Sequence, residues 1–557
     1  MSTKQKLLLS IVIIIGLILA LMGGFRGKHI DTEYSKTLYN KSYYLHTLYD
    51  IASRFEFAIK SKLDYSLEYL DLTDFKERNE EHAWALYFVN GCFVVLGLVS
   101  CFQLAFLLSS NFYFSLLASA ILATCYFWNA EAHYPTTDIA LSSFCITLFT
   151  FLFTEKKNTF TNKLIEGFLL GSCFAIKYFG LVTLLPYLYF KFKRKELTAS
   201  IKSIITAFTF LVICMGDKLL VLLRDGAREL SVQTQQGWAG YNSAEPGFIY
   251  HLKHSFITEY GLSLTILALF GFYYLYKESQ KSQRLRLEVE TILSFIIICF
   301  IVISSTKIKT VRFALPLIPV FAIASSFGIR QIHEWFKNKL TTSILILIAT
   351  MPALYYSTKH AYLMYNADTL HIQANLKSLV DGKTIVVNDK LYFDKTPARE
   401  DKEYKERCTQ KAIDFQKVFY LDKDPSRIIS LNSYRFDRFI YDADYHCPNA
   451  HKAFGNFEDL KVLQISPFKV KKELVPFSFI SNFSPRKPDI DYRNHKGGFF
   501  EFYYKDPQHT EIFQGVCEIK SYPCHFTNGS EAFFLNHFQT AFRDPKRQKI
   551  NLPYISE

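Results

Sequence analysis

The sequence predicts a polytopic α-helical membrane protein with a soluble C-terminal domain. Half of the 557 residues are hydrophobic, yet the mean hydropathy is only +0.07. The average conceals two unlike parts. Residues 1–357 contain repeated apolar runs long enough to cross a hydrocarbon core of about 30 Å, whereas residues 358–557 are polar and aromatic and contain no such run. We therefore expect a transmembrane domain over 1–357, which includes a first outer loop over 24–82, and a soluble domain over 358–557.

The apolar runs predict about 11 transmembrane helices. We place them at residues 6–23, 83–108, 112–130, 138–154, 165–177, 180–190, 199–221, 257–276, 289–305, 313–329 and 341–357. Lys4 and Lys6 precede the first run, as in a cleaved signal peptide, but the length of its apolar core and the lack of a small-x-small site favour an uncleaved anchor. Residues 165–192 carry lysines at both ends, so we expect two short helices that turn near residues 177–180.

The net charge of +13 arises largely from short loops between the apolar runs, so it does not indicate a nucleic-acid partner. Such basic clusters are typical of cytoplasmic loops. The clusters are Lys156, Lys157 and Lys163; Lys191, Lys193, Arg194 and Lys195; Lys277, Lys281, Arg284 and Arg286; and Arg330, Lys337 and Lys339. We therefore expect a multi-pass protein of the inner or plasma membrane, with a cytoplasmic N-terminus and an extracytoplasmic C-terminal domain.

The remaining loops then face outward together. The first outer loop opens with "FRGKHIDTEYSKTLYNKSYY" (residues 25–44), and its later part has apolar residues at helical spacing among charges. That spacing predicts amphipathic helices on the membrane surface, in contact with lipids. The other outer segments are "EAHYPTTD" (131–138), the turn around residue 177, the loop 224–254 and "TKIKTVRF" (306–313).

Four of these features occur in a familiar order. An acidic pair follows the first span, and "HYPTTD", "GFLLGSCFAIKYFGLVTLLP" (167–186) and "VRFALPLIPVFAIA" (311–324) come after it. The chain in this respect resembles the membrane glycosyltransferases of the C superfamily (GT-C), and within them the protein O-mannosyltransferases and aminoarabinose transferases. The resemblance covers roughly residues 1–330. It implies transfer of a sugar from a polyprenyl-phosphate donor to a glycan, lipid or protein acceptor on the non-cytoplasmic face.

The resemblance also implies roles for particular residues. The first-loop acid of the family maps to Asp31, with Glu33 beside it, although the family usually has the two acids adjacent and here Thr32 separates them. The basic positions that face the phosphate map to Lys177 and Arg312. The family often has Tyr after this arginine, where the chain has Phe313.

Elementary chemistry assigns the same residues to the same tasks. Displacement of a lipid phosphate from an anomeric carbon needs a carboxylate that takes the proton of the acceptor, for which Asp31 is the candidate. It also needs fixed positive charge where the phosphate develops negative charge. The candidates for that charge are Lys177, Arg312, Lys307 and Lys309. The alternative for Asp31 is a solvated or helix-capping loop acid.

Three residues of the turn 131–138 are candidates for substrate binding, namely His133, Tyr134 and Asp138. Asp138 begins a span, so it is also a candidate N-cap whose charge complements the helix dipole. Lys177 lies within an apolar run, where an ionisable residue usually faces a cavity or a partner. The alternative is that Lys177 snorkels to the lipid headgroups.

Several kinds of site are absent from the sequence. The chain contains no phosphate-binding loop of the G-x-x-x-x-G-K-[ST] type and no zinc spacing of Cys or His. No cofactor is therefore indicated, although a divalent cation on Asp31, Glu33 and phosphate would be compatible with the residues. The remaining function classes are a transporter or flippase of lipid-linked sugars and a non-catalytic scaffold of envelope assembly.

The cysteines follow the same division of the chain. Seven of the 11 lie in or beside the spans, where cysteine acts as a small apolar residue. The other four are Cys408, Cys447, Cys517 and Cys524. An even number in an extracytoplasmic domain predicts two disulfides, with the pairing open. Short β-rich runs such as "KTIVVN" and "GGFFEFYYK" predict an α/β or mainly β fold for this domain.

Overall fold

A computed structural model describes the helical part of the chain and five strands. The described residues are 2–22, 48, 52, 83–133, 137–154, 159–215, 246–306, 311–337, 339–366, 386–388, 429–431, 461–465, 500–504 and 524–528. Asp31, Glu33, Tyr134, Lys307 and Lys309 lie outside them, as do Cys408, Cys447 and Cys517.

Helices make up nearly all of the described part before residue 367. They are α1 (Thr3–Leu21), α4 (Ala83–Ser109), α5 (Phe112–Thr124), α6 (Tyr126–Ala132), α7 (Thr137–Phe153), α8 (Phe160–Ile176), η4 (Tyr178–Thr183), α9 (Leu184–Lys193), α10 (Leu197–Met215), α12 (Gly247–Tyr250), η6 (His251–Gly261), α13 (Leu262–Ser279), α14 (Gln283–Ser305), η7 (Val311–Leu317), α15 (Ile318–Phe336) and α16 (Lys339–Asn366). Each predicted span overlaps one of these helices or two consecutive ones.

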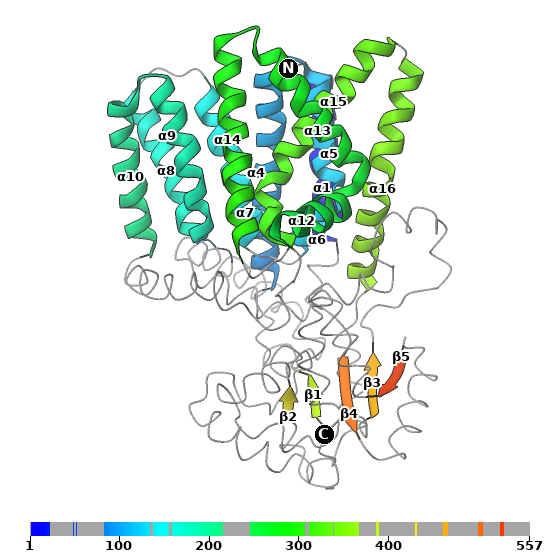
Figure 1. The fold of residues 1–557 in the computed structure, drawn as a ribbon. Helices are drawn as coiled ribbons and strands as arrows, with labels where there is room; N and C mark the ends of the chain where they lie inside the picture. Colours follow the sequence, from blue (N-terminus) through cyan, green and yellow to red (C-terminus); the bar gives the residue numbers. More distant parts are fainter. Residues whose placement is uncertain are drawn as a thin grey trace.

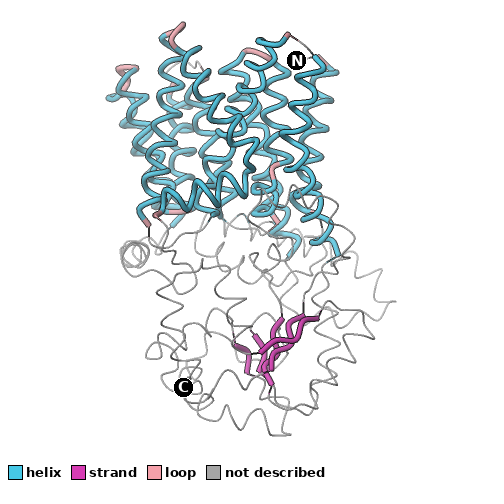
Figure 2. The backbone as a smooth tube through the Cα atoms, turned by 45° about the vertical axis from the view of Figure 1, so that its right-hand side comes forward, coloured by secondary structure: helices cyan, strands magenta, loops and turns pink. Residues whose placement is uncertain are grey.

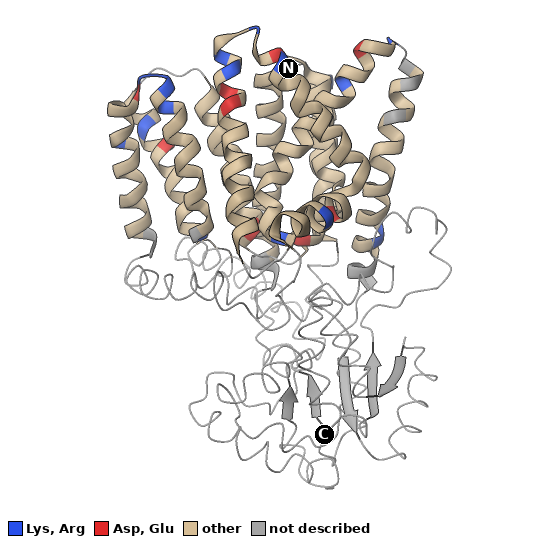
Figure 3. Cartoon of the chain, viewed as in Figure 1, with Lys and Arg blue, Asp and Glu red and all other residues tan. Residues whose placement is uncertain are grey.

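The long helices run side by side between two ends of one bundle (Figure 1), and a second view shows the same arrangement (Figure 2). Lys and Arg are concentrated at the end where the N-terminus lies (Figure 3). The chain alternates between the ends, so α7, α9, α13 and α15, which precede the connections that we expect to be cytoplasmic, all finish at this basic end (Figure 1). We call the opposite end, where α1, α6, α8 and α14 finish and α7 starts, the site end.

Within the described residues, five helices are long and apolar enough to cross a membrane, or six if the pair α5 and α6 is one span. The five are Thr3–Leu21, Tyr87–Ser109, Gly247–Ser279, Gln283–Ser305 and Val311–Phe336. Shorter apolar helices cover Thr137–Phe153 and Leu197–Ile213. The predicted total of 11 spans therefore stays a prediction, because several helices that match predicted spans fall below the length of a full crossing.

The predicted hairpin over residues 165–192 is present as α8 and α9. The turn consists of Lys177 and the 3-10 helix η4. The antiparallel pairing is visible at the basic end, where Lys191 Nζ of α9 donates to Glu166 Oε2 of α8 at 3.0 Å and the Tyr187 hydroxyl donates to Glu166 Oε1. Lys191 and Glu166 are both buried, so each compensates the charge of the other where water cannot.

The predicted span 112–130 is bent rather than continuous. Helices α5 and α6 meet at Cys125 with an angle of 54°. Asn129 of α6 stabilises the break, because its side-chain amide donates to the Ala123 carbonyl at 2.8 Å and so occupies an acceptor that the interrupted helix leaves open. The bend directs α6 toward the end of α1 and toward α16.

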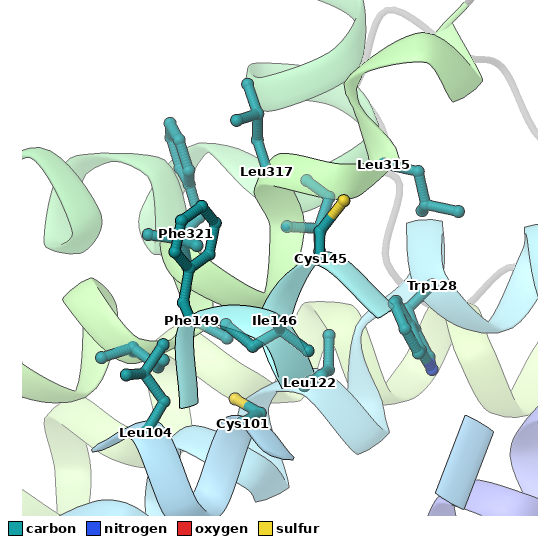
Figure 4. Close-up of a cluster of buried hydrophobic side chains, with 14 of the residues drawn as sticks. Cys101, Leu104, Leu122, Trp128, Cys145, Ile146, Phe149, Leu315, Leu317 and Phe321 are labelled. Atoms are coloured by element: carbon teal, nitrogen blue, oxygen red, sulfur yellow. The ribbon is translucent and has the colours of Figure 1, made fainter. Parts of the chain in front are cut away.

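The core of the bundle is apolar and continuous from α4 and α7 to α15. Figure 4 shows Cys101, Cys145 and Phe149 packed with residues of η7 and α15, all of them buried. Helices α13 and α15 approach so closely that a Cβ on Gly271 would collide with the Ala324 carbonyl and one on Gly328 with the Leu267 carbonyl. Small residues allow such close helix contacts within membranes.

The described strands after residue 366 form one mixed sheet in the order β2-β1-β4-β3-β5. The strands are β1 (Val386–Asn388), β2 (Ile429–Leu431), β3 (Lys461–Ile465), β4 (Phe500–Tyr504) and β5 (Cys524–Asn528). β1 and β2 are parallel, and the other pairs are antiparallel, with Leu463 opposite both Phe502 and Phe526. A sheet in this region agrees with the β-rich runs of the sequence, while the soluble domain over 358–557 stays a prediction.

Candidate functional site

Four predicted site residues are described, and all four lie at the site end of the bundle: His133, Asp138, Lys177 and Arg312. His133 follows α6, Asp138 is in the first turn of α7, Lys177 follows α8, and Arg312 is in η7. They come from segments that are up to 179 positions apart in the sequence, since 312 minus 133 is 179. Among the described residues, no group of three His, Cys, Asp or Glu side chains is arranged to hold a metal ion.

Asp138 and Lys177 form a tight ion pair. Lys177 Nζ lies 2.6 Å from Asp138 Oδ1. The side chain of Asp138 is only 4% exposed and that of Lys177 is 18% exposed, so the carboxylate is buried and the ammonium retains access to the outside. The position of Asp138 in the first turn of α7 also suits a negative charge, because helix N-termini carry partial positive charge.

Lys177 can form this pair because its backbone leaves the helix. Helix α8 ends at Ile176, and Lys177 has extended backbone angles of φ −159° and ψ 139°. The Gly180 N–H then bonds to the Lys177 carbonyl at 2.7 Å, which starts the turn into η4. The lysine thus occupies a corner between two helices, where its side chain reaches across to the start of α7.

A third segment, η7, completes the cluster. Lys177 Nζ lies 5.1 Å from the centre of the Phe313 ring, within the range of a cation–π contact. Arg312 precedes Phe313 in the same short helix and is half-buried. The Ser142 hydroxyl of α7 donates to the Leu315 carbonyl at 3.1 Å, which fixes η7 against the helix that carries Asp138. We call Asp138, Lys177, Arg312 and Phe313 the site cluster.

His133 has contacts of a different kind. It is fully buried, and its ring nitrogens lie 2.9 Å from the Asn129 carbonyl oxygen and 3.0 Å from the Met22 carbonyl oxygen. Its ring also packs edge-to-face on His360 of α16, with centroids 4.7 Å apart. Burial lowers the pKa of His133 to about 4, so the ring is neutral at pH 7 and donates to only one of the two carbonyls. His133 therefore joins the ends of α1, α6 and α16, and substrate binding by His133 stays a prediction.

The residues of η6 were not predicted from the sequence to lie near the site. This segment is a π-helix from His251 to Gly261, and residues 247–254 were expected in a loop. His251, His254, Glu259 and Tyr260 are buried, while Lys253 is exposed. The available signal was the mixture of histidines and an acid with apolar residues in "HLKHSFITEYG", because ionisable residues next to a span often belong to functional sites.

Comparison with known families gives one partial match. Residues 244–393 match the Alg9-like mannosyltransferase family. The matched segment contains η6, α13, α14, η7 with Arg312, and α15 and α16. A comparison with curated proteins gives no match.

The solved structures that the chain matches include an oligosaccharyltransferase and ArnT. The chain is 12% identical to the oligosaccharyltransferase of Archaeoglobus fulgidus in the apo form, with a TM-score of 0.43 over 64% of this chain and 56% of that one. It is 11% identical to ArnT of Cupriavidus metallidurans bound to undecaprenyl phosphate, with a TM-score of 0.42 over 78% of this chain and 90% of that one. The chain thus spans just over half the length of the oligosaccharyltransferase, and TM-scores below 0.5 assign no fold by themselves.

The resemblance to GT-C glycosyltransferases that the motifs predicted is thus confirmed by the family match over residues 244–393.

Proposed function

We propose that the chain is a membrane glycosyltransferase that uses a sugar donor linked to polyprenyl phosphate. The acceptor is a glycan, a lipid or a protein on the non-cytoplasmic face, and the transferred group is a hexose or a pentose. The reaction inverts the anomeric carbon. The observation that carries the proposal is the site cluster, which unites a buried acid, a partly exposed lysine and an arginine-bearing turn at one end of the bundle.

The site cluster suits the phosphate of the donor. An ammonium group has three N–H donors, and Asp138 accepts one from Lys177. The 18% exposure of Lys177 leaves a side of this group that a phosphate oxygen can reach. Arg312 is one residue from the ring that packs on Lys177, and guanidinium groups bind phosphate through two parallel hydrogen bonds. Lys307 and Lys309 precede η7 and are proposed to add positive charge.

The chemistry requires one proton transfer and one displacement. Asp31 takes the proton of the acceptor hydroxyl as its oxygen bonds to the anomeric carbon, and the bond from that carbon to the phosphate oxygen breaks. The polyprenyl phosphate leaves with the electron pair, stabilised by Lys177 and Arg312. Glu33 supports Asp31 or binds a divalent cation with it, while Tyr134 and Asp138 contribute to substrate binding.

The location of the charges favours an enzyme over a transporter. Transporters place the binding site near the middle of the membrane, at the interface of repeated halves. In the described helices, charged side chains gather toward the two ends of the bundle (Figure 3). A donor whose lipid tail stays in the bilayer would present its phosphate at such an end. We propose the inner or plasma membrane as the location, with residues 358–557 on the extracytoplasmic side near the acceptor.

The function can be tested before the sugar is known. Glycolipids and envelope glycans of a deletion strain are compared by mass spectrometry with those of the parent and of strains complemented with the parental gene or with Arg312→Ala. We expect the deletion to lose one sugar from one class of glycan, and only the parental gene to restore it. Two results would contradict a transferase. The first is an unchanged set of glycans in the deletion strain, and the second is accumulation of the donor in that strain with no glycan product missing.

A further inference from the structure

The segment η6 is an uncommon kind of helix, and it contacts η7, the segment that carries Arg312. It is a π-helix of 11 residues that ends at Gly261, whose φ of +106° is a conformation that residues other than glycine rarely adopt. α12 leads directly into η6 and lies across the site end of the bundle instead of running along it (Figure 1). π-helical turns are rare and are often found at functional sites.

η6 is fixed to the helix that follows Arg312. The Phe256 ring stacks on the Phe321 ring of α15, with centroids 4.5 Å apart and planes 19° apart. The Tyr260 and Ser325 hydroxyls lie 2.8 Å apart, also between η6 and α15. These two contacts hold η6 against α15, so the other side chains of η6 also have fixed positions.

One of those contacts reaches the peptide that joins Val311 to Arg312. The Ser255 Oγ atom lies 3.3 Å from the Val311 carbonyl oxygen, and His251 Nδ1 lies 2.9 Å from Ser255 Oγ. A carbonyl oxygen only accepts, so the serine O–H donates to Val311. The serine oxygen must then accept from His251, which places the imidazole proton on Nδ1. His251 and Ser255 are both fully buried, so water does not compete for the bond between them.

The two ends of η7 are thus held from two directions. Leu315 and Leu317 are buried in the core beside Cys145 (Figure 4), and α7 bonds to the Leu315 carbonyl. At the other end, the serine hydroxyl fixes the plane of the peptide between Val311 and Arg312. Arg312 lies between these two anchors, so the direction in which its side chain leaves the backbone depends on the bond from η6.

We propose that His251 and Ser255 are positioning residues that orient Arg312 toward the phosphate of the donor. The proposal rests on the proposed function, because it assigns the phosphate to Arg312. The two residues touch neither substrate nor reacting atoms. They act through the carbonyl of Val311, and their loss allows the backbone of η7 to turn away from the productive direction.

The test is a double-mutant cycle on the full chain purified in detergent, with binding of undecaprenyl phosphate as the readout. We expect Ser255→Ala to weaken binding about tenfold, the equivalent of one neutral hydrogen bond. Arg312→Ala should weaken binding further, and Ser255→Ala should add nothing in the Arg312→Ala background. Ser255→Thr keeps the hydroxyl and should bind like the parent. A residue that only stabilises the fold would weaken binding in both backgrounds.

Ser263→Ala is the matched control, since the Ser263 hydroxyl donates to the Ala349 carbonyl at 3.2 Å without any link to η7. It should leave binding unchanged. If Ser255→Ala does not fold, His251→Asn and Ser255→Cys replace it in the cycle. The positioning role alone would be overturned if the binding losses of Ser255→Ala and Arg312→Ala were additive. It would also be overturned if Arg312→Ala weakened binding and Ser255→Ala did not. Normal binding by Arg312→Ala would overturn both this role and the assignment of the phosphate to Arg312.

Discussion

Removal of the lysine in the site cluster should lower the free energy of unfolding, because a buried carboxylate then loses its ammonium partner. In Lys177→Ala, the carboxylate of Asp138, which is 4% exposed in the parent, loses the ammonium that lies 2.6 Å away. Removal of one partner of a buried pair typically costs 3–5 kcal/mol. The 18% exposure of Lys177 places this pair at the lower limit, so we expect a loss of about 3 kcal/mol in the free energy of unfolding.

The same substitution should affect the donor in two ways. It removes a cation that we propose contacts the donor phosphate, and it leaves a carboxylate that would repel that phosphate. We therefore expect binding of undecaprenyl phosphate to weaken by at least about tenfold, or about 1.4 kcal/mol. Asp138→Asn in the Lys177→Ala background removes the repelling charge and keeps the shape. The double variant should regain about 1–2 kcal/mol of stability and part of the affinity, because a neutral amide costs less to bury than a carboxylate that has lost its ammonium.

The assay is chemical unfolding in detergent and donor binding for the parent, both single variants and the double variant. Lys281→Ala is the matched control at the basic end, where Lys281 and Glu278 are also 2.6 Å apart but 69% and 38% exposed. An exposed pair is worth less than about 1 kcal/mol, so this control should change little. A double variant as unstable and as weakly binding as Lys177→Ala alone would refute the reasoning, because the burial of Asp138 would then carry no cost.

Three further predictions concern topology, disulfides and pH. Cysteine labelling at Lys193 and at Ser243 should report opposite sides of the membrane, because we expect the basic loops to be cytoplasmic. Labelling of both positions from the same side would overturn the hairpin of α8 and α9 as a membrane feature. Mass mapping without reductant should find the four cysteines after residue 358 in disulfides, namely Cys408, Cys447, Cys517 and Cys524. Four free thiols would contradict an oxidising compartment. The pKa of His133 falls from 6.5 to about 4 on folding. As the pH falls, the unfolded chain therefore binds a proton at this residue before the folded chain does. We expect up to about 3 kcal/mol of the free energy of unfolding to be lost between pH 6.5 and pH 4. His133→Asn should flatten this slope in unfolding measured against pH, and an unchanged slope would show that other groups cause it.

The sequence predicted most of the helices because apolar runs of sufficient length leave few alternatives. It also predicted the turn after α8, since lysines at both ends of residues 165–192 required the chain to return to the side from which it came. The structure brings Asp138, Lys177 and Arg312 to one end because each lies where a helix starts or stops on that side.

The bend at Cys125 and the π-helix could not be read from hydropathy. A sliding average over residues 112–130 stays apolar throughout. The bend is stabilised by hydrogen bonds from the Asn129 amide to the Ala123 carbonyl and from the Ser357 hydroxyl to the Thr124 carbonyl. The π-helix has the composition of an ordinary helix. It depends on tertiary contacts from Phe256 and Tyr260 to α15, which no local pattern contains. The pairing of Asp138 with Lys177 could not be predicted either, because the same sequence is compatible with helix capping by Asp138, snorkelling by Lys177 and an ion pair between the two.

The most direct measurement of the central claim is transfer of a radiolabelled sugar from polyprenyl phosphate by the purified chain, compared with Asp31→Asn and Glu33→Gln. Asp31→Asn keeps the shape of the side chain and removes the proton acceptor. We predict that transfer falls about 10²–10⁴-fold, the usual contribution of a general base, while binding of undecaprenyl phosphate is retained. Full activity in Asp31→Asn with none in Glu33→Gln would exchange the two roles. Full activity in both variants would contradict the assignment of catalysis to this loop.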